Sequence, residues 1–416
     1  IIKNNAMKQI YWANLLHIYQ PPDWDKAIID KVVRESYLPF FQNLKKYPEL
    51  KITLNICGSL TEQLHQHGHT AVLESIAELA ERNQIDFTGS AKYHPILALI
   101  PAQEVERQIQ LNYDCNRKFF GSAYRPKGFF IPEMCYSEKV AEIVEKLGYK
   151  WLVLDEISAQ GTVGNTTFQR GYCLGQKSLK IVFRNRLISD LFFMDILKTP
   201  KIFFDAIEKS QRTKQYLITG FDGENLGHHN PKLLEIWFKL INTNSIKTLT
   251  YSELLSRYRN FDTVKPLPSS WASRESELKD NEPYYLWKNR KNAVHQKQWQ
   301  LTNLAIKNIK TTPLSESSHQ RARNMLDKAM SSDQYWWAAA SPWWDTNIVA
   351  QAANKLLRVF RVLGVNKTTL RQATKIHDEI IDLIEQWQTS GEADRIRKDY
   401  LGTEDFTRVF GGQKVT

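Results

Sequence analysis

The strongest constraint on the fold is the alternation between short apolar runs and longer stretches of helical period in the first half of the chain. Stretches such as "TAVLESIAELAERN" and "SEKVAEIVEKLGY" repeat apolar residues at i, i+3, i+4 and i+7, which is the spacing of an amphipathic helix. Strands that alternate with such helices indicate βαβ units and a parallel sheet. The predicted strands are 9–16, 51–56, 84–88, 127–131, 150–154, 180–183 and 215–221.

Seven strands within about 220 residues favour a closed or nearly closed barrel over an open sheet. Beyond residue 265 the pattern changes, because "PLPSSWASRESELKDNEPYYLW" is rich in proline, serine and charge and is typical of a connector. Four later segments have a helical period throughout. We therefore expect an α/β barrel domain over residues 1–265 and a C-terminal helical domain over residues 266–416.

The composition limits the class of protein and its partners. The chain has 416 residues, 42% hydrophobic and 24% charged, as in a soluble globular protein, and its apolar runs are shorter than the ~20 residues of a membrane helix. Its net charge of +11 is spread along the chain without a dense basic block. We expect a cytoplasmic protein with no membrane or nucleic-acid partner, and the sequence leaves the oligomeric state open.

Polar side chains follow nearly every predicted strand. "HIYQPP" comes after Leu16, "GSAKYHP" after Thr88, "PEMCYS" after Ile131 and "DGENLGHH" after Phe221. In a β/α barrel the carboxyl ends of the strands converge on one face, where binding and catalytic sites are built. Residues more than 100 positions apart in the sequence can therefore share one site.

Two of these strand-end residues suit glycoside hydrolysis with retention of configuration. That reaction needs a pair of carboxylates about 5 Å apart, one as nucleophile and one as acid and then base. Glu133 and Asp222 stand at the ends of the fourth and seventh predicted strands, and Pro132 keeps the chain extended just before Glu133. The alternative is that Glu133 is a polar residue that merely ends a strand.

Five segments, taken in order, resemble the motifs of glycoside hydrolase family 57. They are "LLHIYQPP", "TGSAKYHPIL", "GFFIPEMCYS", "FDGENLGHH" and "SSDQYWW", and they extend from residue 15 to residue 337. The resemblance implies an incomplete (β/α)7 barrel followed by a helical domain. It also implies a retaining enzyme without cofactor or metal that acts on α-glucans, as an amylase or a 4-α-glucanotransferase.

The resemblance assigns roles to the acids of two motifs. Glu133 aligns with the family's catalytic nucleophile, Asp222 aligns with its general acid/base, and Glu224 matches a position near the substrate. A charged Glu224 would help to keep Asp222 protonated, because like charges a few ångströms apart resist joint ionisation.

The first motif departs from the family pattern. Where the family commonly has His-Gln-Pro, this chain has Tyr19-Gln20-Pro21. A tyrosine can bond a sugar hydroxyl but cannot carry the charge of an imidazolium, so we expect altered specificity at the first sugar subsite.

The predicted substrate-binding set comes from the resemblance and from position after a strand. For the tryptophans, packing in the core is an equal alternative, and rim ion pairs would explain the arginine and aspartate after the sixth strand equally well. The set is His17, Tyr19, Gln20, His94, Glu224, Arg186, Asp190, Asp333, Trp336 and Trp337.

Two other functions compete with this interpretation. A metal-dependent polysaccharide deacetylase could use His17, His94, His228 and His229 as ligands, but the chain lacks an Asp-Asp pair on the first strand and a following H-x-x-x-H. A barrel that binds glucan without catalysis is the other, although both carboxylates are present.

Overall fold

The computed structural model describes residues 9–175, 178–193, 196–210, 215–311 and 316–402. The chain forms two compact units. The first contains the chain up to Lys92 and then Leu97–Trp271, and the second contains Tyr93–Ile96 and the chain from Ala272 onward. The ends of the predicted domains at residues 1 and 416 lie outside the described residues. No helix in the described part of the chain is both long and apolar enough to span a membrane.

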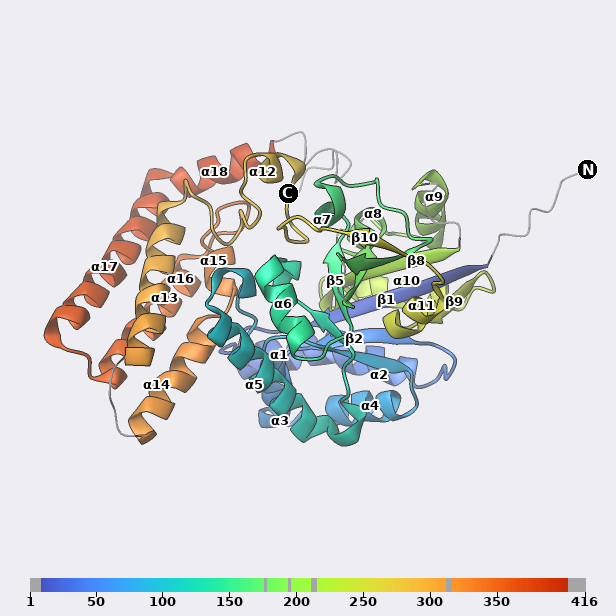
Figure 1. Cartoon of the computed structure of the whole chain (residues 1–416), viewed down its shortest axis with the longest axis horizontal. Coiled ribbons are helices and arrows are strands. Elements are labelled where there is room, and N and C mark those ends of the chain that lie inside the picture. The colour runs from blue at the N-terminus through green and yellow to red at the C-terminus, as the bar shows by residue number, and fades with distance from the viewer. Residues whose placement is uncertain (1–8, 176–177, 194–195, 211–214, 312–315, 403–416) are drawn as a thin grey trace, which may run out of the picture. The chain divides into compact units, whose positions relative to one another are not determined.

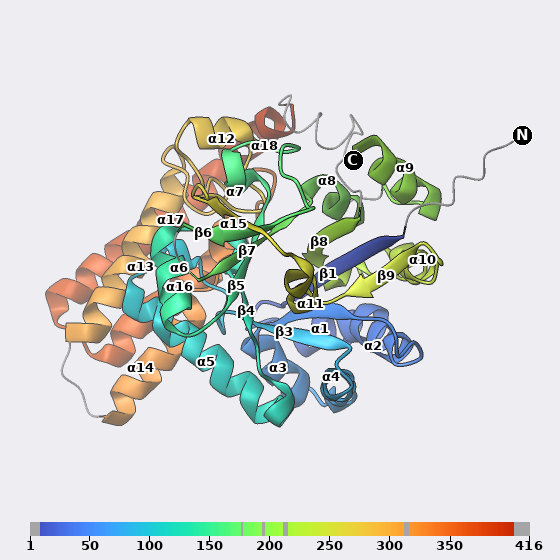
Figure 2. The same ribbon diagram turned by 45° about the vertical axis from the view of Figure 1, so that its right-hand side comes forward.

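A curled, mixed sheet forms the centre of the first unit (Figures 1 and 2). Its main run of strands is parallel, and these strands are buried on both faces, as expected where helices cover the outside and side chains fill the inside. In spatial order they are β8 (Tyr216–Asp222), β1 (Ile10–Ile18), β2 (Ile52–Ile56), β3 (Ile85–Gly89), β4 (Gly128–Phe130), β5 (Trp151–Asp155) and β7 (Lys180–Arg184).

Each of the seven predicted strands is found within two residues of its predicted bounds, and three further strands extend the sheet. β6 (Gly171–Leu174) runs antiparallel to β7, β10 (Phe261–Val264) pairs with β6, and β9 (Ile246–Leu249) pairs with the first half of β1. The mixed sheet therefore has ten strands among the described residues.

Helices link most of the parallel strands and bury their apolar faces against the sheet. Trp12 of β1, fully buried, contacts Phe203 and Trp237 of two such helices. The helices of this unit are α1 (Lys26–Val32), α2 (Leu38–Leu44), α3 (Gly58–Gln66), α4 (Thr70–Glu81), α5 (Ala102–Phe120), α6 (Glu138–Lys146), α7 (Ile157–Gln160), α8 (Arg186–Ser189), α9 (Pro200–Ser210), α10 (Pro231–Ile241) and α11 (Tyr251–Arg257).

The second unit is helical. Its long helices α13, α14, α16 and α17 pack against one another (Figure 1). α16 shows why its bounds lie where they do, since Asp345 caps its first amide groups and Gly364 ends it in a left-handed conformation. The helices are α12 (Glu275–Lys279), α13 (Ala293–Thr311), α14 (Glu316–Ala329), α15 (Asp333–Trp336), α16 (Thr346–Leu363), α17 (Lys367–Ser390) and α18 (Glu392–Leu401).

Candidate active site

The register of the parallel strands brings the first and last motifs of the sheet together. His17 near the end of β1 lies beside Asn55 of β2 on one side and beside Asp222, the last residue of β8, on the other. The ring of His17 stacks on Phe130, the last residue of β4, with centroids 4.5 Å apart. The carboxyl ends of three other strands, β2, β4 and β8, therefore lie next to this histidine.

Glu133 lies in a tight turn directly after β4. Glu133 and Met134 both have a positive φ, of 58° and 48°, a region that residues other than glycine seldom occupy and that concentrates at functional sites. The indole Nε1 of Trp271 donates a hydrogen bond to Oε2 of Glu133 over 2.8 Å, and the edge of the same ring faces His17. Trp271 thus joins the Glu133 carboxylate to the histidine that neighbours Asp222.

His17 is buried and held in one tautomer. Asn55 donates through its Nδ2 to the Thr88 hydroxyl, so its Oδ1 is the acceptor for Nδ1–H of His17 over 2.7 Å. Burial lowers the pKa of His17 to about 4, since the hydrogen bond to Asn55 only partly opposes the loss of solvent. The imidazole is therefore neutral near pH 7.

Asp222 stays protonated to a higher pH than an ordinary aspartate side chain. Burial, and next the negative charge of Glu224, raise the pKa of Asp222 to about 8, and the Arg184 guanidinium opposes them. Within the described part of the chain, no hydrogen bond contributes to this shift. A carboxyl group with this pKa can act as a proton donor at neutral pH.

Glu224, two residues later, is surrounded by donors instead. Its Oε1 accepts hydrogen bonds from the backbone N–H of Tyr19 over 3.2 Å, from Nε2 of Gln20 over 3.1 Å and from the hydroxyl of Tyr37. Burial raises the pKa of Glu224, whereas these donors lower it because they bond to the charged form. Of the two neighbouring acids, Glu224 is the one built to carry the negative charge.

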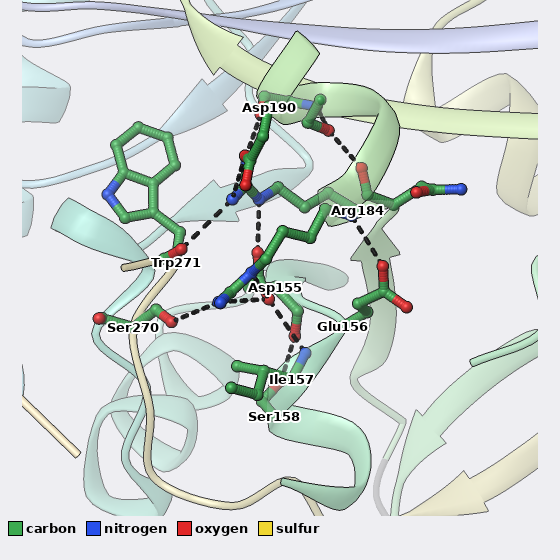
Figure 3. A network of polar contacts seen from close by, with 12 residues as sticks. Asp155, Glu156, Ile157, Ser158, Arg184, Asp190, Ser270 and Trp271 are labelled. Carbon is green, nitrogen blue, oxygen red and sulfur yellow. Dashed lines mark hydrogen bonds and ion pairs between the residues drawn. The ribbon is translucent and has the colours of Figure 1, made fainter. Parts of the chain in front are cut away.

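A network of polar contacts reaches the backbone of Trp271 (Figure 3). The Nε of Arg184 donates to Oδ2 of Asp155 over 2.6 Å, and its other nitrogens reach the carbonyl oxygens of Gly220 and Trp271 and the carboxylate of Asp190. Arg184 thus contacts both the strand that ends at Asp222 and the residue that bonds Glu133.

Arg186 completes this network. Its side chain pairs with Asp155 over 2.7 Å and donates to the carbonyl oxygen of Ser270, and its backbone N–H donates to Glu156. The structure therefore places Arg186 in a buried ion pair with Asp155 and the half-buried Asp190 in an ion pair with Arg184. Their predicted contact with substrate stays a prediction.

Comparison with known proteins identifies the family. A model of glycosyl hydrolase family 57 matches residues 7–266, more than half of the chain. The chain belongs to glycosyl hydrolase family 57.

The relatives of this family 57 chain are distant. It is 22% identical over 266 residues to an alpha-amylase of Pyrococcus horikoshii (61% of this chain, 41% of the relative) and 23% identical over 265 residues to a 4-alpha-glucanotransferase of Thermococcus litoralis (61% and 39%). The chain thus spans about two fifths of the length of these curated relatives. The crystal structure of the family 57 branching enzyme of P. horikoshii superposes with a TM-score of 0.65 at 14% identity, covering 88% of this chain and 94% of that one.

Four residues that the family motifs single out belong to the second unit of this family 57 chain. His94 has a positive φ of 56° and its ring bonds the Ser332 hydroxyl over 3.0 Å, while Asp333 begins α15. Trp336 and Trp337 are half-buried and both contact the ring of Trp343. They are therefore neither fully packed in a core nor isolated, and their predicted role in sugar binding stays a prediction.

The histidines of the metal-dependent alternative lie in both units of the family 57 chain, and each unit is taken by itself. Among the described residues of each unit, no three His, Cys, Asp or Glu side chains bring ligand atoms close enough to share an ion. His228, a predicted alternative ligand, instead pairs through Nδ1 with Oε2 of Glu35 over 2.7 Å.

Two residues of the site were not predicted from the sequence. Trp271 lies in the segment that looks like a connector, 138 residues from its partner Glu133. Tyr37 lies within a helical stretch and 187 residues from Glu224. Neither follows a predicted strand, so the position after a strand could not reveal them.

Proposed function

We propose that the chain is a retaining glycoside hydrolase or transglycosylase that acts on α-1,4-linked glucans, with Glu133 as nucleophile and Asp222 as general acid/base. The observation that carries the proposal is the contrast between the two acids. Burial and the charge of Glu224 raise the pKa of Asp222 to about 8, so Asp222 can donate a proton at neutral pH, whereas Glu133 is held by a hydrogen bond from the N–H of Trp271. A retaining glycosidase needs one acid protonated and the other ionised at the same pH.

The proposed reaction has two steps. In the first, a Glu133 oxygen attacks the anomeric carbon while Asp222 gives its proton to the glycosidic oxygen, so that the C–O bond breaks and a glucosyl ester forms on Glu133. In the second, the Asp222 carboxylate takes a proton from water or from a sugar hydroxyl, whose oxygen attacks the anomeric carbon and releases Glu133. Water as acceptor gives hydrolysis, and a sugar gives transfer.

The same proposal covers the fold and the substrate contacts. We take the seven parallel strands as the incomplete (β/α)7 barrel of the family, with the catalytic domain within residues 1–265 and the helical domain within residues 266–416. The relatives named above as an alpha-amylase and a 4-alpha-glucanotransferase support an α-glucan as substrate. Half-buried tryptophans such as Trp336 suit the apolar faces of glucose rings.

The test follows products from α-1,4-linked maltooligosaccharides with the wild type, Glu133→Gln and Asp222→Asn. The proposal expects shorter products, or both longer and shorter ones, from the wild type only, and it expects both variants to bind the oligosaccharide. The anomer released first, read by proton NMR, should be α. A first product of β configuration, or full activity of Glu133→Gln, would contradict the proposal, and unchanged substrate with retained binding would point to a binding module.

A further inference from the structure

One turn of the helix before β2 has an unusual geometry. α1 and α2 are joined without a break by the π-helical segment Val33–Tyr37, whose flanking residues keep right-handed helical dihedrals. A π-turn is bonded from i to i+5 and holds more residues than an α-turn, so consecutive side chains are separated by a smaller angle around the axis. Several neighbouring side chains can then face the same side. Such turns are rare and are frequent at functional sites.

Three consecutive residues of this π-turn contact the loop 222–230, which begins with Asp222 at the end of β8 and contains Glu224. Glu35 pairs with His228 over 2.7 Å, the Ser36 hydroxyl donates to the carbonyl oxygen of Gly223 over 3.0 Å, and the Tyr37 hydroxyl donates to Oε1 of Glu224. The loop is thus held at Gly223 near its start, at Glu224, and at His228 near its end.

The backbones of the turn and the loop also touch. At Gly227, where φ is 116°, a Cβ atom would lie 2.1 Å from the carbonyl oxygen of Glu35. Only a glycine permits this approach. The side-chain contacts therefore rest on close packing of the π-turn against the loop.

We propose that Tyr37 is a positioning residue of the acid/base site: its hydroxyl holds Glu224 as the anion beside Asp222, and the π-turn fixes the loop that carries both acids. This inference rests on the proposed function in assigning the acid/base role to Asp222. Tyr37 itself does not touch the reacting atoms, since it acts through Glu224.

The direction of the hydrogen bonds supports this role. The Nε2 of Gln20 donates to the hydroxyl oxygen of Tyr37 over 3.2 Å, so the single hydroxyl proton is directed to Glu224. Burial, and next the charge of Glu224, raise the pKa of Tyr37 well above its usual range, so it remains a donor at every working pH. Only 1% of the surface of Tyr37 is exposed, so water from the solvent cannot take the place of its hydroxyl.

The other charged groups around Asp222 come from several elements. Glu224 on its own loop favours the protonated form of Asp222, and Arg184 at the end of β7 favours the ionised form. His17 on β1 is neutral, because its pKa is lowered to about 4.

Farther out, the pair of Glu35 and His228 holds the rim of the loop, where Lys31 and Arg34 also act on Glu35. Both members of this pair are partly exposed, so water and salt screen their charges. Tyr37 is thus the buried hydroxyl that biases the proton toward Asp222 and away from Glu224.

The experiment compares Tyr37→Phe with wild type by two readouts. One is the pH profile of kcat/KM on a maltooligosaccharide. The other is a carbon-13 NMR titration of Asp222 in protein labelled at the aspartate carboxyl carbons, assigned with Asp222→Asn and recorded without substrate. Loss of the hydroxyl should raise the pKa of Glu224 and lower that of Asp222 by about one unit, and the alkaline limb of activity should move to lower pH by the same amount. Tyr258→Phe is the matched control, since its hydroxyl donates to the Phe168 carbonyl oxygen over 2.8 Å, and it should leave both readouts unchanged.

A double-mutant cycle separates this role from a merely structural one. In a Glu224→Gln background the additional Tyr37→Phe change should shift the Asp222 titration no further, because no anion remains to be held. An unshifted Asp222 titration in folded Tyr37→Phe would overturn the inference, and so would an equal shift in both backgrounds. The NMR titration needs no substrate, so a chain inactive on α-glucans would refute the proposed function and leave the inference about Tyr37 to be decided by the titration.

Discussion

Replacing Trp271 by phenylalanine would remove one hydrogen bond from Glu133 and keep the aromatic ring. The indole Nε1 lies 2.8 Å from Oε2 of Glu133, a normal length for a bond to a charged acceptor. A phenyl ring can still pack against His17 and Phe130, whose rings lie 5.9 and 5.7 Å from that of Trp271. The change therefore isolates the donor from the packing.

The size of the effect follows from the type of bond. Hydrogen bonds to charged groups contribute about 1.5–3 kcal/mol. One tenfold change in rate corresponds to 1.36 kcal/mol, so kcat/KM should fall by about 10- to 150-fold if the bond is fully used in the transition state. Because Trp271 contacts the proposed nucleophile Glu133, we expect the fall in kcat/KM to come mainly from kcat and less from KM.

The assay is steady-state hydrolysis or transfer on a maltooligosaccharide, with folding checked by thermal unfolding. Trp151→Phe is the matched control, because Trp151 begins β5, and its indole N–H donates to the Ser252 hydroxyl over 3.2 Å. It should alter stability more than kcat/KM. A folded Trp271→Phe enzyme with kcat/KM within twofold of wild type would refute the reasoning that Trp271 sets the direction of Glu133.

Three further predictions concern charge and backbone. Asp155→Asn leaves two buried guanidinium groups without their shared anion, and the free energy of unfolding in urea should fall by about 3–5 kcal/mol; a loss below 1 kcal/mol would contradict the buried network. Wild-type activity should decline as the pH rises through about 8, where Asp222 loses its proton. Glu224→Gln should move this decline to lower pH, because the charge that raises the pKa of Asp222 is removed. A decline at the same pH in Glu224→Gln would exclude the charge of Glu224 as a cause of the raised pKa. Gly227→Ala should lower the melting temperature more than Gly68→Ala. Gly68 also has a positive φ, but a Cβ atom there would meet open space. Equal losses of melting temperature in the two variants would argue against close packing at Gly227.

The sequence was sufficient for the seven strands of the main parallel run, because strands buried on both faces consist mostly of apolar residues. β5 is such a case, because it is buried at every position and begins Trp-Leu-Val-Leu. The helices between strands carry an equally clear period. β10 has no buried residue, and its mixed composition gave no signal of a strand. β6 and β9 each bury only their first and last residues, so neither has the continuous buried run of the main strands.

The sequence predicted residues that follow a strand and that the structure brings together, but it missed partners of the candidate site that lie elsewhere. Asp222 lies beside His17 because parallel strands in register present their ends together. Trp271 reaches Glu133 from an irregular segment held by Arg184, and no local pattern encodes such a tertiary contact. Tyr37 depends on a π-turn within a stretch of ordinary helical composition, which a search for period 3.6 does not detect.

The most direct test of the account is to trap the covalent intermediate. Asp222→Asn should slow the second step, so that an activated α-glucosyl fluoride, whose leaving group needs little protonation, accumulates the glucosyl ester. Mass spectrometry of the digested protein should then find one added glucosyl group on the peptide that contains Glu133, and none in the double variant Glu133→Gln, Asp222→Asn. A label on another residue, or release of β-glucose without any label, would contradict the central claim that Glu133 is the nucleophile and Asp222 its acid/base partner.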